Sequence, residues 1–171
     1  SITIPDSVTS IGDYVFKNTP WIDVQKEKNP LIIVNEILID GKNCKGDVII
    51  PDGVTNILGD AFENCSAITS ITIPDSVTSI GDNAFYSCNA LTSISIPDSV
   101  TSIGSSAFSN CTALTSITIP DSVTSIESDA FEDCKSLTFI VIKNAGCEIY
   151  DSEYTISDTA TIYGYKGSTA Q

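Results

Sequence analysis

A 23-residue unit occurs three times, almost unchanged, between residues 68 and 136. The copies read ITSITIPDSVTSIGDNAFYSCNA, LTSISIPDSVTSIGSSAFSNCTA and LTSITIPDSVTSIESDAFEDCKS. Self-similarity at a fixed period of this size is typical of solenoids, in which each unit is covered only by its neighbours. The repeat therefore predicts a stack of similar coils. It also limits what the sequence says about function, because most of its residues are needed for stacking.

Each repeat begins with a short strand that has one buried face. In LTSITIP the fourth and sixth residues are apolar and alternate with polar ones, which is the period of a strand. Proline follows and ends the strand, since it has no N–H to donate to a neighbour. Pro-Asp-Ser predicts a turn in which Asp or Ser binds nearby backbone. VTSI predicts a second short strand, and AFxxC predicts a short helical turn with Ala, Phe and Cys directed inward.

The chain is expected to form a single solenoid with four parts. Residues 1–16 are the rest of a first repeat, and residues 17–44 are a degenerate turn of the same array. Residues 45–136 hold four regular repeats, and residues 137–171 hold the last strand and an incomplete C-terminal cap. Terminal repeats are atypical because one of their faces has no neighbour. Because the chain starts inside a repeat and contains no Met, we interpret it as a piece of a longer protein.

Both ends of the chain carry partial copies of the pattern. In the first repeat, the residues that match the inward positions of the later copies are Ile2, Ile4, Val8, Ile11 and Phe16. Near the C-terminus, strand-like pieces occur at residues 147–150 and 161–165. We therefore expect a stacked first coil and a C-terminal cap with short strands.

Residues 17–44 lose the repeat sequence but keep its register, since Pro5 and Pro51 are 46 residues apart, which is two periods. LIIVNEILIDG holds two apolar strand candidates around Asn35 and Glu36, which predicts a β-hairpin over residues 31–40. Two interpretations are open. The segment is a decorated turn, or it is a functional protrusion built on Trp21 and the hairpin, because variations between repeats often lie on a binding face.

Acidic residues dominate the charge: 22 Asp and Glu stand against eight Lys, with neither Arg nor His, for a net charge of −14. Such a surface repels nucleic acid and anionic lipid, and without Arg it lacks the fork that binds phosphate. No apolar run approaches the ~20 residues of a membrane helix. We therefore expect neither a nucleic-acid partner nor membrane insertion. With no His to act as a base, we also expect no enzyme activity and no cofactor.

The pattern LxxIxIPxxVxxIGxxAFxxC is matched in four copies and half-matched at the start of the chain, and it resembles the leucine-rich repeat of the BspA-like family. The resemblance implies an α/β fold, namely a right-handed leucine-rich-repeat solenoid with a parallel β-sheet, short second strands and short helical turns. Members of this family are secreted or surface proteins of anaerobic gut and rumen bacteria and are implicated in adhesion. The resemblance implies no catalytic activity.

The expected function is therefore non-catalytic binding of a protein or cell-surface ligand, or adhesion, by a secreted or cell-surface bacterial protein. The alternative is a structural spacer in a larger multimodular protein, with a dockerin or an anchoring module elsewhere and an association with cellulosomes. Near-identical repeats favour the spacer, since binding faces tend to diversify. The degenerate turn at residues 17–44 favours binding.

Six cysteines are present, and four of them recur at the repeat period. The periodic cysteines are Cys65, Cys88, Cys111 and Cys134, while Cys44 and Cys147 lie outside the period. An even count in a secreted chain suggests disulfides. Cysteines at the same position of every repeat instead predict a column of free, buried thiols, because disulfide geometry is strict. No CxxC pair and no His exist, so we expect no zinc or other metal site.

An aspartate follows the proline of each repeat, and together these aspartates would form a row of carboxylates. They are Asp6, Asp52, Asp75, Asp98 and Asp121. Stacked like charges repel one another, which a bound cation would relieve. The alternative is that each aspartate is a turn residue facing water. The chain lacks both an EF-hand loop and the Gly- and Asp-rich nonapeptide of calcium-binding β-rolls, which favours the second interpretation.

The outward face of the first strands is the candidate partner-binding face. Its middle residues, Ser70, Thr72, Ser93, Ser95, Ser116 and Thr118, carry hydroxyls, and we group them with Trp21 as the candidate site. In leucine-rich repeats this sheet lines the side where partners usually dock. The alternative is that small hydroxyl residues only tolerate a crowded parallel sheet. Phe139 and Val141 end the two rows with apolar side chains, unless the C-terminal tail covers them.

Overall fold

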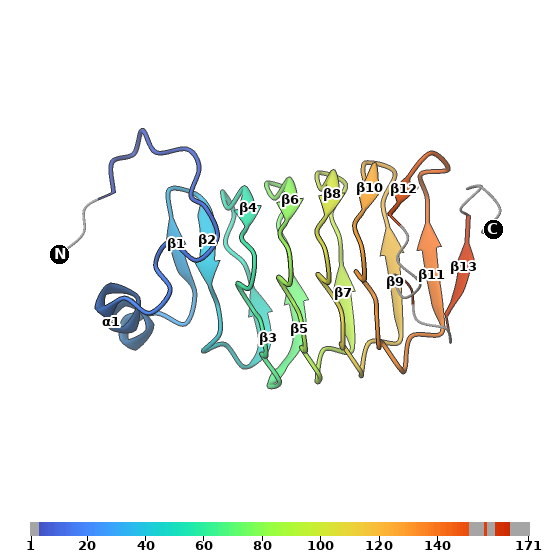
Figure 1. Cartoon of the computed structure of the whole chain (residues 1–171), viewed down its shortest axis with the longest axis horizontal. Coiled ribbons are helices and arrows are strands. Elements are labelled where there is room, and N and C mark those ends of the chain that lie inside the picture. The colour runs from blue at the N-terminus through green and yellow to red at the C-terminus, as the bar shows by residue number, and fades with distance from the viewer. Residues whose placement is uncertain (1–3, 151–155, 157–159, 165–171) are drawn as a thin grey trace.

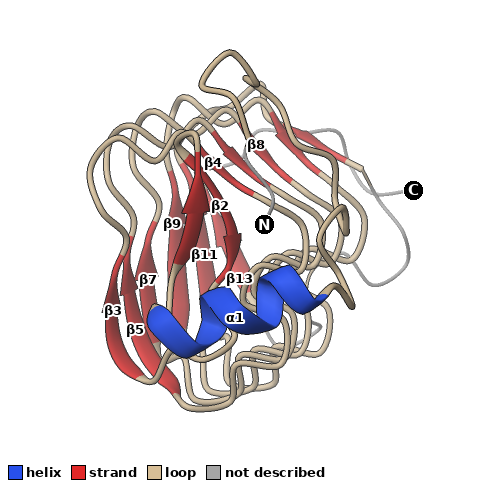
Figure 2. Cartoon of the chain, turned by 90° about the vertical axis from the view of Figure 1, so that its left-hand side faces the viewer, coloured by secondary structure: helices blue, strands red, loops and turns tan. Residues whose placement is uncertain are grey.

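The computed structural model describes residues 4–150, 156 and 160–164. This part of the chain winds into a stack of coils whose long axis runs from β1 (Ile32–Val34) to β13 (Thr161–Tyr163), as Figure 1 shows. Two rows of strands form two sides of the coil, and turns form the rest (Figure 2). The predicted solenoid with a parallel sheet and short second strands is therefore confirmed.

The longer strands form the main sheet, which is parallel. They are β3 (Gly46–Ile49), β5 (Ile68–Thr72), β7 (Ser93–Ser95), β9 (Ser116–Ile119), β11 (Phe139–Ile142) and β13. Strand pairing joins them in two groups, β3-β5-β7 and β9-β11-β13, and none joins β7 to β9 among the described residues. The register places Ile71 beside Ile94, and Ile117 beside Ile140. Equivalent residues of successive repeats therefore lie in columns.

The shorter strands form a second, seven-stranded sheet. In spatial order they are β1, β2 (Ile37–Asp40), β4 (Asn56–Ile57), β6 (Ser79–Ile80), β8 (Ser102–Ile103), β10 (Ser125–Ile126) and β12 (Glu148–Ile149). All neighbours are parallel except β1 and β2, which form an antiparallel hairpin around Asn35 and Glu36. The hairpin lies where the sequence predicts one, and it occupies the place of the coil that precedes residues 45–67.

The AFxxC segments form the third side as rows of tight turns rather than as continuous helices. In one repeat, Asn83 and Ser87 adopt left-handed backbone conformations with φ of 55° and 57°. Ala84 and Cys88 donate their N–H groups to carbonyls three residues earlier, whereas Phe85 donates to Ala107 in the next repeat. The expected helical turn is thus broken at every second donor, because those donors bind the neighbouring coil. Asn and Asp adopt the left-handed conformation more readily than other non-glycine residues, and Ser87 and Ser106 adopt it here as well.

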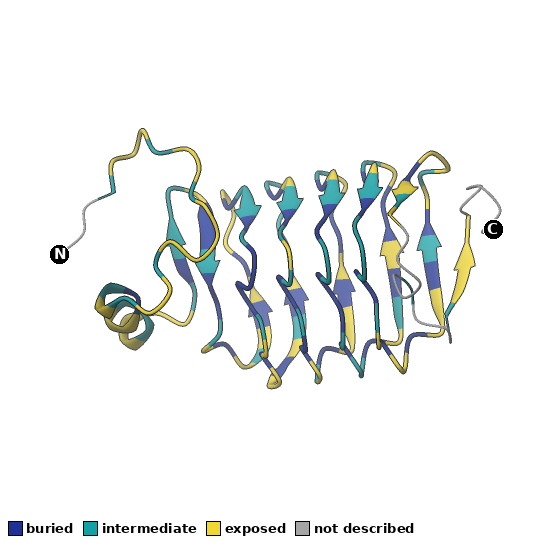
Figure 3. Cartoon of the chain, in the orientation of Figure 1, coloured by how far each residue is buried: buried dark blue, intermediate teal, exposed yellow. Residues whose placement is uncertain are grey.

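Columns of identical side chains fill the interior of the stack. The rings of Phe62, Phe85, Phe108 and Phe131 are fully buried, and successive centroids are 5.3, 5.2 and 5.5 Å apart, with interplanar angles below 10°. Isoleucine and valine columns surround them, and the buried side chains form one continuous cluster. Figure 3 shows the resulting alternation of more and less buried positions along the main strands from β3 to β11. A stack of this kind removes apolar surface from water at every coil.

The N-terminal end departs from the sequence expectation. Residues 4–16 form no strand, and Ile4, Val8, Ile11 and Phe16 are only half-buried. The reason is that the hairpin and Gly41 fill the preceding coil, since Gly41 donates its N–H to the Ala61 carbonyl at 2.7 Å. Residues 4–16 therefore keep the sequence of a repeat without its stacked strand.

Residues 4–16, which we call the N-terminal arm, are followed by a helix that the sequence did not predict. Helix α1 (Pro20–Lys28) crosses the N-terminal end of the stack (Figure 2). Thr19 caps it by accepting the Ile22 N–H, and Pro20 occupies its first position, where no N–H is needed. Ile22 is its one buried side chain, so the helix covers the stack with a narrow contact.

At the C-terminal end, β12 continues the second sheet and β13 continues the main sheet. Both lie within the strand-like pieces expected at residues 147–150 and 161–165, and β13 ends at Tyr163. Ile156 makes one isolated bridge to Phe131. The remainder of the expected cap, residues 151–155, 157–159 and 165–171, lies outside the described residues.

Candidate binding surface

The structure brings the six predicted hydroxyl residues together on the outward face of β5, β7 and β9. Thr72, Ser93, Ser95 and Thr118 are exposed, and Ser70 and Ser116 are half-buried. Pairing of β5 with β7 sets Ser70 beside Ser93 and Thr72 beside Ser95. The isoleucines between them point into the core, so this face is separate from the columns that hold the coils together.

Side chains of other kinds lie at the two ends of this hydroxyl face. Towards the N-terminus, Asp47 accepts hydrogen bonds from the hydroxyls of Ser70 and Thr69, at 2.7 and 2.9 Å, and these bonds lower the pKa of Asp47. Ile49, on the same strand, is 72% exposed. Towards the C-terminus, Phe139 is 43% exposed and meets the Tyr163 ring edge-on, with 6.4 Å between centroids. Strand β13 therefore leaves Phe139 partly open.

A shallow groove of about 420 Å³ lies on this face between β7 and β9. It follows the discontinuity of the main sheet, where no strand pairing is found among the described residues. Its walls are the hydroxyl residues of the two strands, Ser93, Ser95, Ser116 and Thr118. Asp75 and Asp98 also line it, and Lys143 is the one cation in its lining.

The aspartates that follow each proline face water and are not tied to the turn. Asp52, Asp75, Asp98 and Asp121 are exposed, and none has a hydrogen bond or ion pair within the described part of the chain. The neighbouring serines make the contact instead. Ser76 and Ser99 donate to the carbonyls of Val54 and Val77, one repeat earlier, at 2.7 and 2.6 Å, while the equivalent hydroxyl of Ser122 is buried without a partner among these residues.

Trp21 does not belong to the hydroxyl face. It lies on α1, half-buried, with its ring 4.5 Å from that of Phe16 and tilted by 39°. The 31–40 hairpin belongs to the second sheet rather than to the main one. The candidate site therefore separates into the hydroxyl face and an N-terminal edge on other elements.

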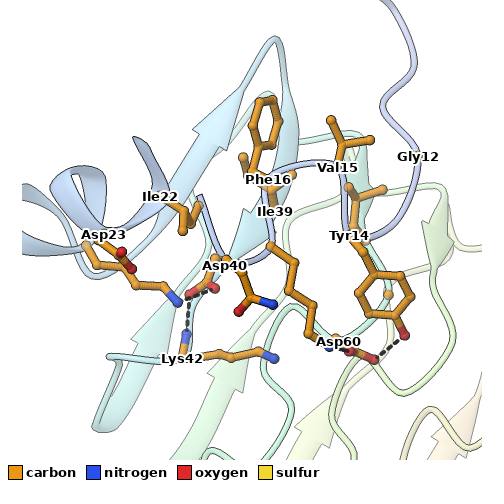
Figure 4. Close-up of a pocket in the computed structure, with 15 residues that line it drawn as sticks. Gly12, Tyr14, Val15, Phe16, Ile22, Asp23, Ile39, Asp40, Lys42 and Asp60 are labelled. Atoms are coloured by element: carbon orange, nitrogen blue, oxygen red, sulfur yellow. Dashed lines mark hydrogen bonds and ion pairs between the residues drawn. The ribbon is translucent and has the colours of Figure 1, made fainter. Parts of the chain in front are cut away.

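The N-terminal edge holds a pocket of about 290 Å³ between the arm, α1 and the 58–60 turn (Figure 4). Several of its charged groups pair with one another, and the Lys42 ammonium pairs with Glu63 outside the lining. Lys26 contacts Asp40 at 2.9 Å, and Asp60 accepts the Tyr14 hydroxyl at 3.0 Å and faces Lys17 at 3.5 Å. Burial first, and then the hydrogen bond to Asp60, raises the pKa of Tyr14. These contacts, which we call the clasp, therefore hold the N-terminal arm against the stack.

The arm uses a contact that recurs in the regular array. Asp13 accepts the Gly59 N–H at 2.9 Å, and Asp82 accepts the Ser105 N–H at 2.8 Å in the same way. Asp13 and Gly59 lie two periods apart, whereas Asp82 and Ser105 lie one period apart. The arm thus docks on the 58–60 turn as the preceding repeat would.

All six cysteines are free and buried, as predicted. Cys88, Cys111 and Cys134 donate to the carbonyls of Phe62, Phe85 and Phe108, at 3.2, 3.1 and 3.0 Å. Burial raises the pKa of the Cys134 thiol to about 12, and burial raises that of Cys44 to about 11. For Cys88, the contact with Cys65 and then burial raise the pKa far above its usual range. These thiols stay protonated and are poor nucleophiles at neutral pH.

No cluster of three or more His, Cys, Asp or Glu side chains able to hold a metal ion occurs in the described ranges. None of the helices in those ranges is long and apolar enough to cross a membrane.

The sequence predicted the hydroxyl face, but it predicted neither the groove nor the clasp. The Thr-Pro start of α1 was a usable signal for the helix. No comparable sequence signal predicted the groove, because the repeats that flank it are nearly identical.

Comparison with known proteins assigns the chain to a family. The BspA-type leucine-rich repeat region matches residues 1–37 and 41–160, as six copies. The chain belongs to the BspA-type leucine-rich repeat family. This BspA-type match includes the arm at residues 4–16, which carries the sequence signature outside the regular stack. No curated protein matches the chain.

Solved structures of leucine-rich proteins share the fold of this chain. The leucine-rich repeat protein TpLRR of T. pallidum is 30% identical, with a TM-score of 0.62 over 72% of this chain and 56% of that one. A leucine-rich cell surface protein from Faecalibacterium prausnitzii A2-165 is 29% identical, with a TM-score of 0.56 over 77% of this chain and 40% of that one. A Bacteroides ovatus leucine-rich repeat protein, 24% identical with a TM-score of 0.52 over 78% and 49%, shares the fold. The chain spans about half the length of these proteins.

Proposed function

We propose that this chain is a non-catalytic recognition module that binds a protein or cell-surface ligand through the hydroxyl face of β5, β7 and β9. One observation carries the proposal: this face is uncovered, and its side chains contribute nothing to the interior columns. The residues that could serve a partner are thus separate from those that hold the coils together. Leucine-rich repeats generally act in protein–protein interaction, which supports the same assignment.

A catalytic role is disfavoured by the chemistry available. The chain has no His, its cysteines are buried, and burial raises the pKa of the Cys111 and Cys134 thiols. The described carboxylates gather no metal-binding cluster. The chain therefore lacks histidine, the side chain that most often acts as a general base.

We place the protein outside the cell, either secreted or at the cell surface, in an adhesive role. The support is family membership and the description of the Faecalibacterium prausnitzii relative as a cell surface protein. The acidic balance, with a net charge of −14, also disfavours nucleic acid and anionic membranes as ligands.

A spacer role is the second candidate, and the near-identity of the repeats over residues 68–136 favours it. A spacer needs only the interior columns, so substitution of its outer face has no consequence for its role. The two candidates therefore differ in what substitution of the hydroxyl face does.

Binding of the labelled chain to proteins from host-cell and bacterial surfaces distinguishes them. Ser95→Lys places a bulky charge on the hydroxyl face, and Ser136→Lys places the same charge at an exposed site in the turns. Recognition predicts that the unsubstituted chain and Ser136→Lys retain the same proteins, and that Ser95→Lys loses them. Retention of the same proteins by all three forms, or of none by any form, contradicts recognition through this face.

A further inference from the structure

The groove between β7 and β9 has a lining that selects for donors and positive charge. Hydroxyls form its walls, and Asp75 and Asp98 stand beside them with no partner among the described residues. Carboxylates only accept hydrogen bonds, whereas hydroxyls both donate and accept. Lys143 is the single positive charge in the lining. The groove therefore presents an excess of acceptors and a net negative charge.

The distribution of charge along the chain reinforces this local excess. Residues 1–45 hold five of the eight lysines and six of the 22 acidic residues. The remaining residues, 46–171, hold 16 acidic residues and only three lysines. The hydroxyl face lies wholly on this second, acidic part. A field of one sign over an open face attracts partners of the opposite sign and speeds their association.

The lining also disfavours other classes of ligand. No aromatic ring lines the groove, so it lacks the platform on which sugar rings and other flat ligands stack. Its isoleucines belong to the core, which leaves no exposed apolar anchor within it. An anionic ligand would meet Asp75 and Asp98 at the rim.

We propose that the occupant of this groove is a lysine- or arginine-rich segment of a partner protein. Its ammonium or guanidinium groups pair with Asp75 and Asp98, and its backbone N–H and C=O groups meet the hydroxyls of Ser95 and Thr118. The inference rests on the proposed function, and it adds the chemical class of the partner. It also gives a role to the exposed carboxylates of Asp75 and Asp98, which no turn contact uses.

A peptide of eight lysines, with a peptide of eight glutamates as its counterpart, tests the inference by titration calorimetry at 50 mM salt. The groove variant is Asp75→Asn/Asp98→Asn. The matched control, Glu132→Gln/Asp133→Asn, removes two charges from the turn side. We expect the lysine peptide alone to bind, with affinity about tenfold lower in the groove variant, near its original value in the control, and falling as salt rises. Equal loss in both variants, or no binding, overturns the inference.

Two further measurements separate this inference from the proposed function and from self-association. If surface proteins lost by Ser95→Lys are retained by Asp75→Asn/Asp98→Asn, the hydroxyl face binds a partner that is not cationic, and only the present inference fails. If Ser95→Lys retains them too, the proposed function fails as well. Light scattering reports the remaining occupant: a dimer that Ser95→Lys dissociates identifies a second copy of the chain in the groove and overturns a cationic partner.

Discussion

The thiol of Cys111 donates a hydrogen bond to the backbone carbonyl oxygen of Phe85 across 3.1 Å. The two residues belong to adjacent coils, so each such bond joins one repeat to the next. The same carbonyl also accepts the Cys88 N–H at 3.2 Å within its own turn. The cysteine column therefore fills space, like a small hydrophobe, and satisfies the second lone pair of a buried carbonyl.

Thiol labelling tests the cysteine column. All six cysteines are free and buried, so we expect a thiol reagent at neutral pH to react slowly with the folded protein. In denaturant it should react with six thiols per chain. Rapid reaction of several thiols in the folded protein would refute their burial, and fewer than six after denaturation would reveal disulfides.

Alkaline pH should weaken the stack. A thiol with a raised folded-state pKa holds its proton more tightly when folded than when unfolded, where its pKa is about 8.5. Its contribution to stability is therefore complete below about pH 8.5 and is lost as pH rises towards the folded value, which is about 12 for Cys134. We expect the free energy of unfolding to fall between pH 9 and about 11. The fall should be shallower in Cys134→Ala, and an identical slope would argue against a thiol origin.

Gly41 should tolerate no side chain. A Cβ on Gly41 would lie 2.1 Å from the Phe62 ring, which ends the phenylalanine column at this point. Gly41→Ala should therefore destabilise the protein by about 1–3 kcal/mol through overpacking. Gly146→Ala is the matched control, because its Cβ would have no neighbour closer than 3.5 Å. Thermal melting should separate the two variants, and equal melting temperatures would mean that Phe62 moves aside at little cost.

Asp60→Asn should release the arm without unfolding the stack. The substitution removes the charge that faces Lys17 and weakens the bond from Tyr14, while the phenylalanine column is untouched. Trypsin should then cleave after Lys17 faster, and the Tyr14 pKa should fall towards its usual value because one of its causes is lost. Asp52→Asn, which removes an exposed charge, is the control. Equal cleavage rates would show that Asp60 does not hold the arm.

The sequence predicted the parts of the fold that repeat. Phe85 and Cys88 recur at a fixed station, and a stack is the arrangement that buries every copy at once. The hydroxyl face followed from the same register, since residues that alternate with inward isoleucines must point outward.

The features that periodicity missed depend on contacts between unlike segments. Phe16 matches the phenylalanine station but packs on Trp21, because Gly41 and the hairpin fill the coil that precedes Phe62. Nearly identical repeats predict a continuous main sheet, yet pairing stops between β7 and β9. The strand segments at residues 91–97 and 114–120 differ only by Ser95 in place of Thr118, a change too small to predict the interruption.

The separation of stacking residues from surface residues is the central claim, and paired urea unfolding of Phe108→Ala and Ser95→Lys tests it most directly. Phe108 is fully buried between two rings, so its loss should lower the free energy of unfolding by about 3–5 kcal/mol. Ser95 is exposed, and its substitution should change that free energy by less than about 0.5 kcal/mol. Similar values for the two variants would contradict the claim.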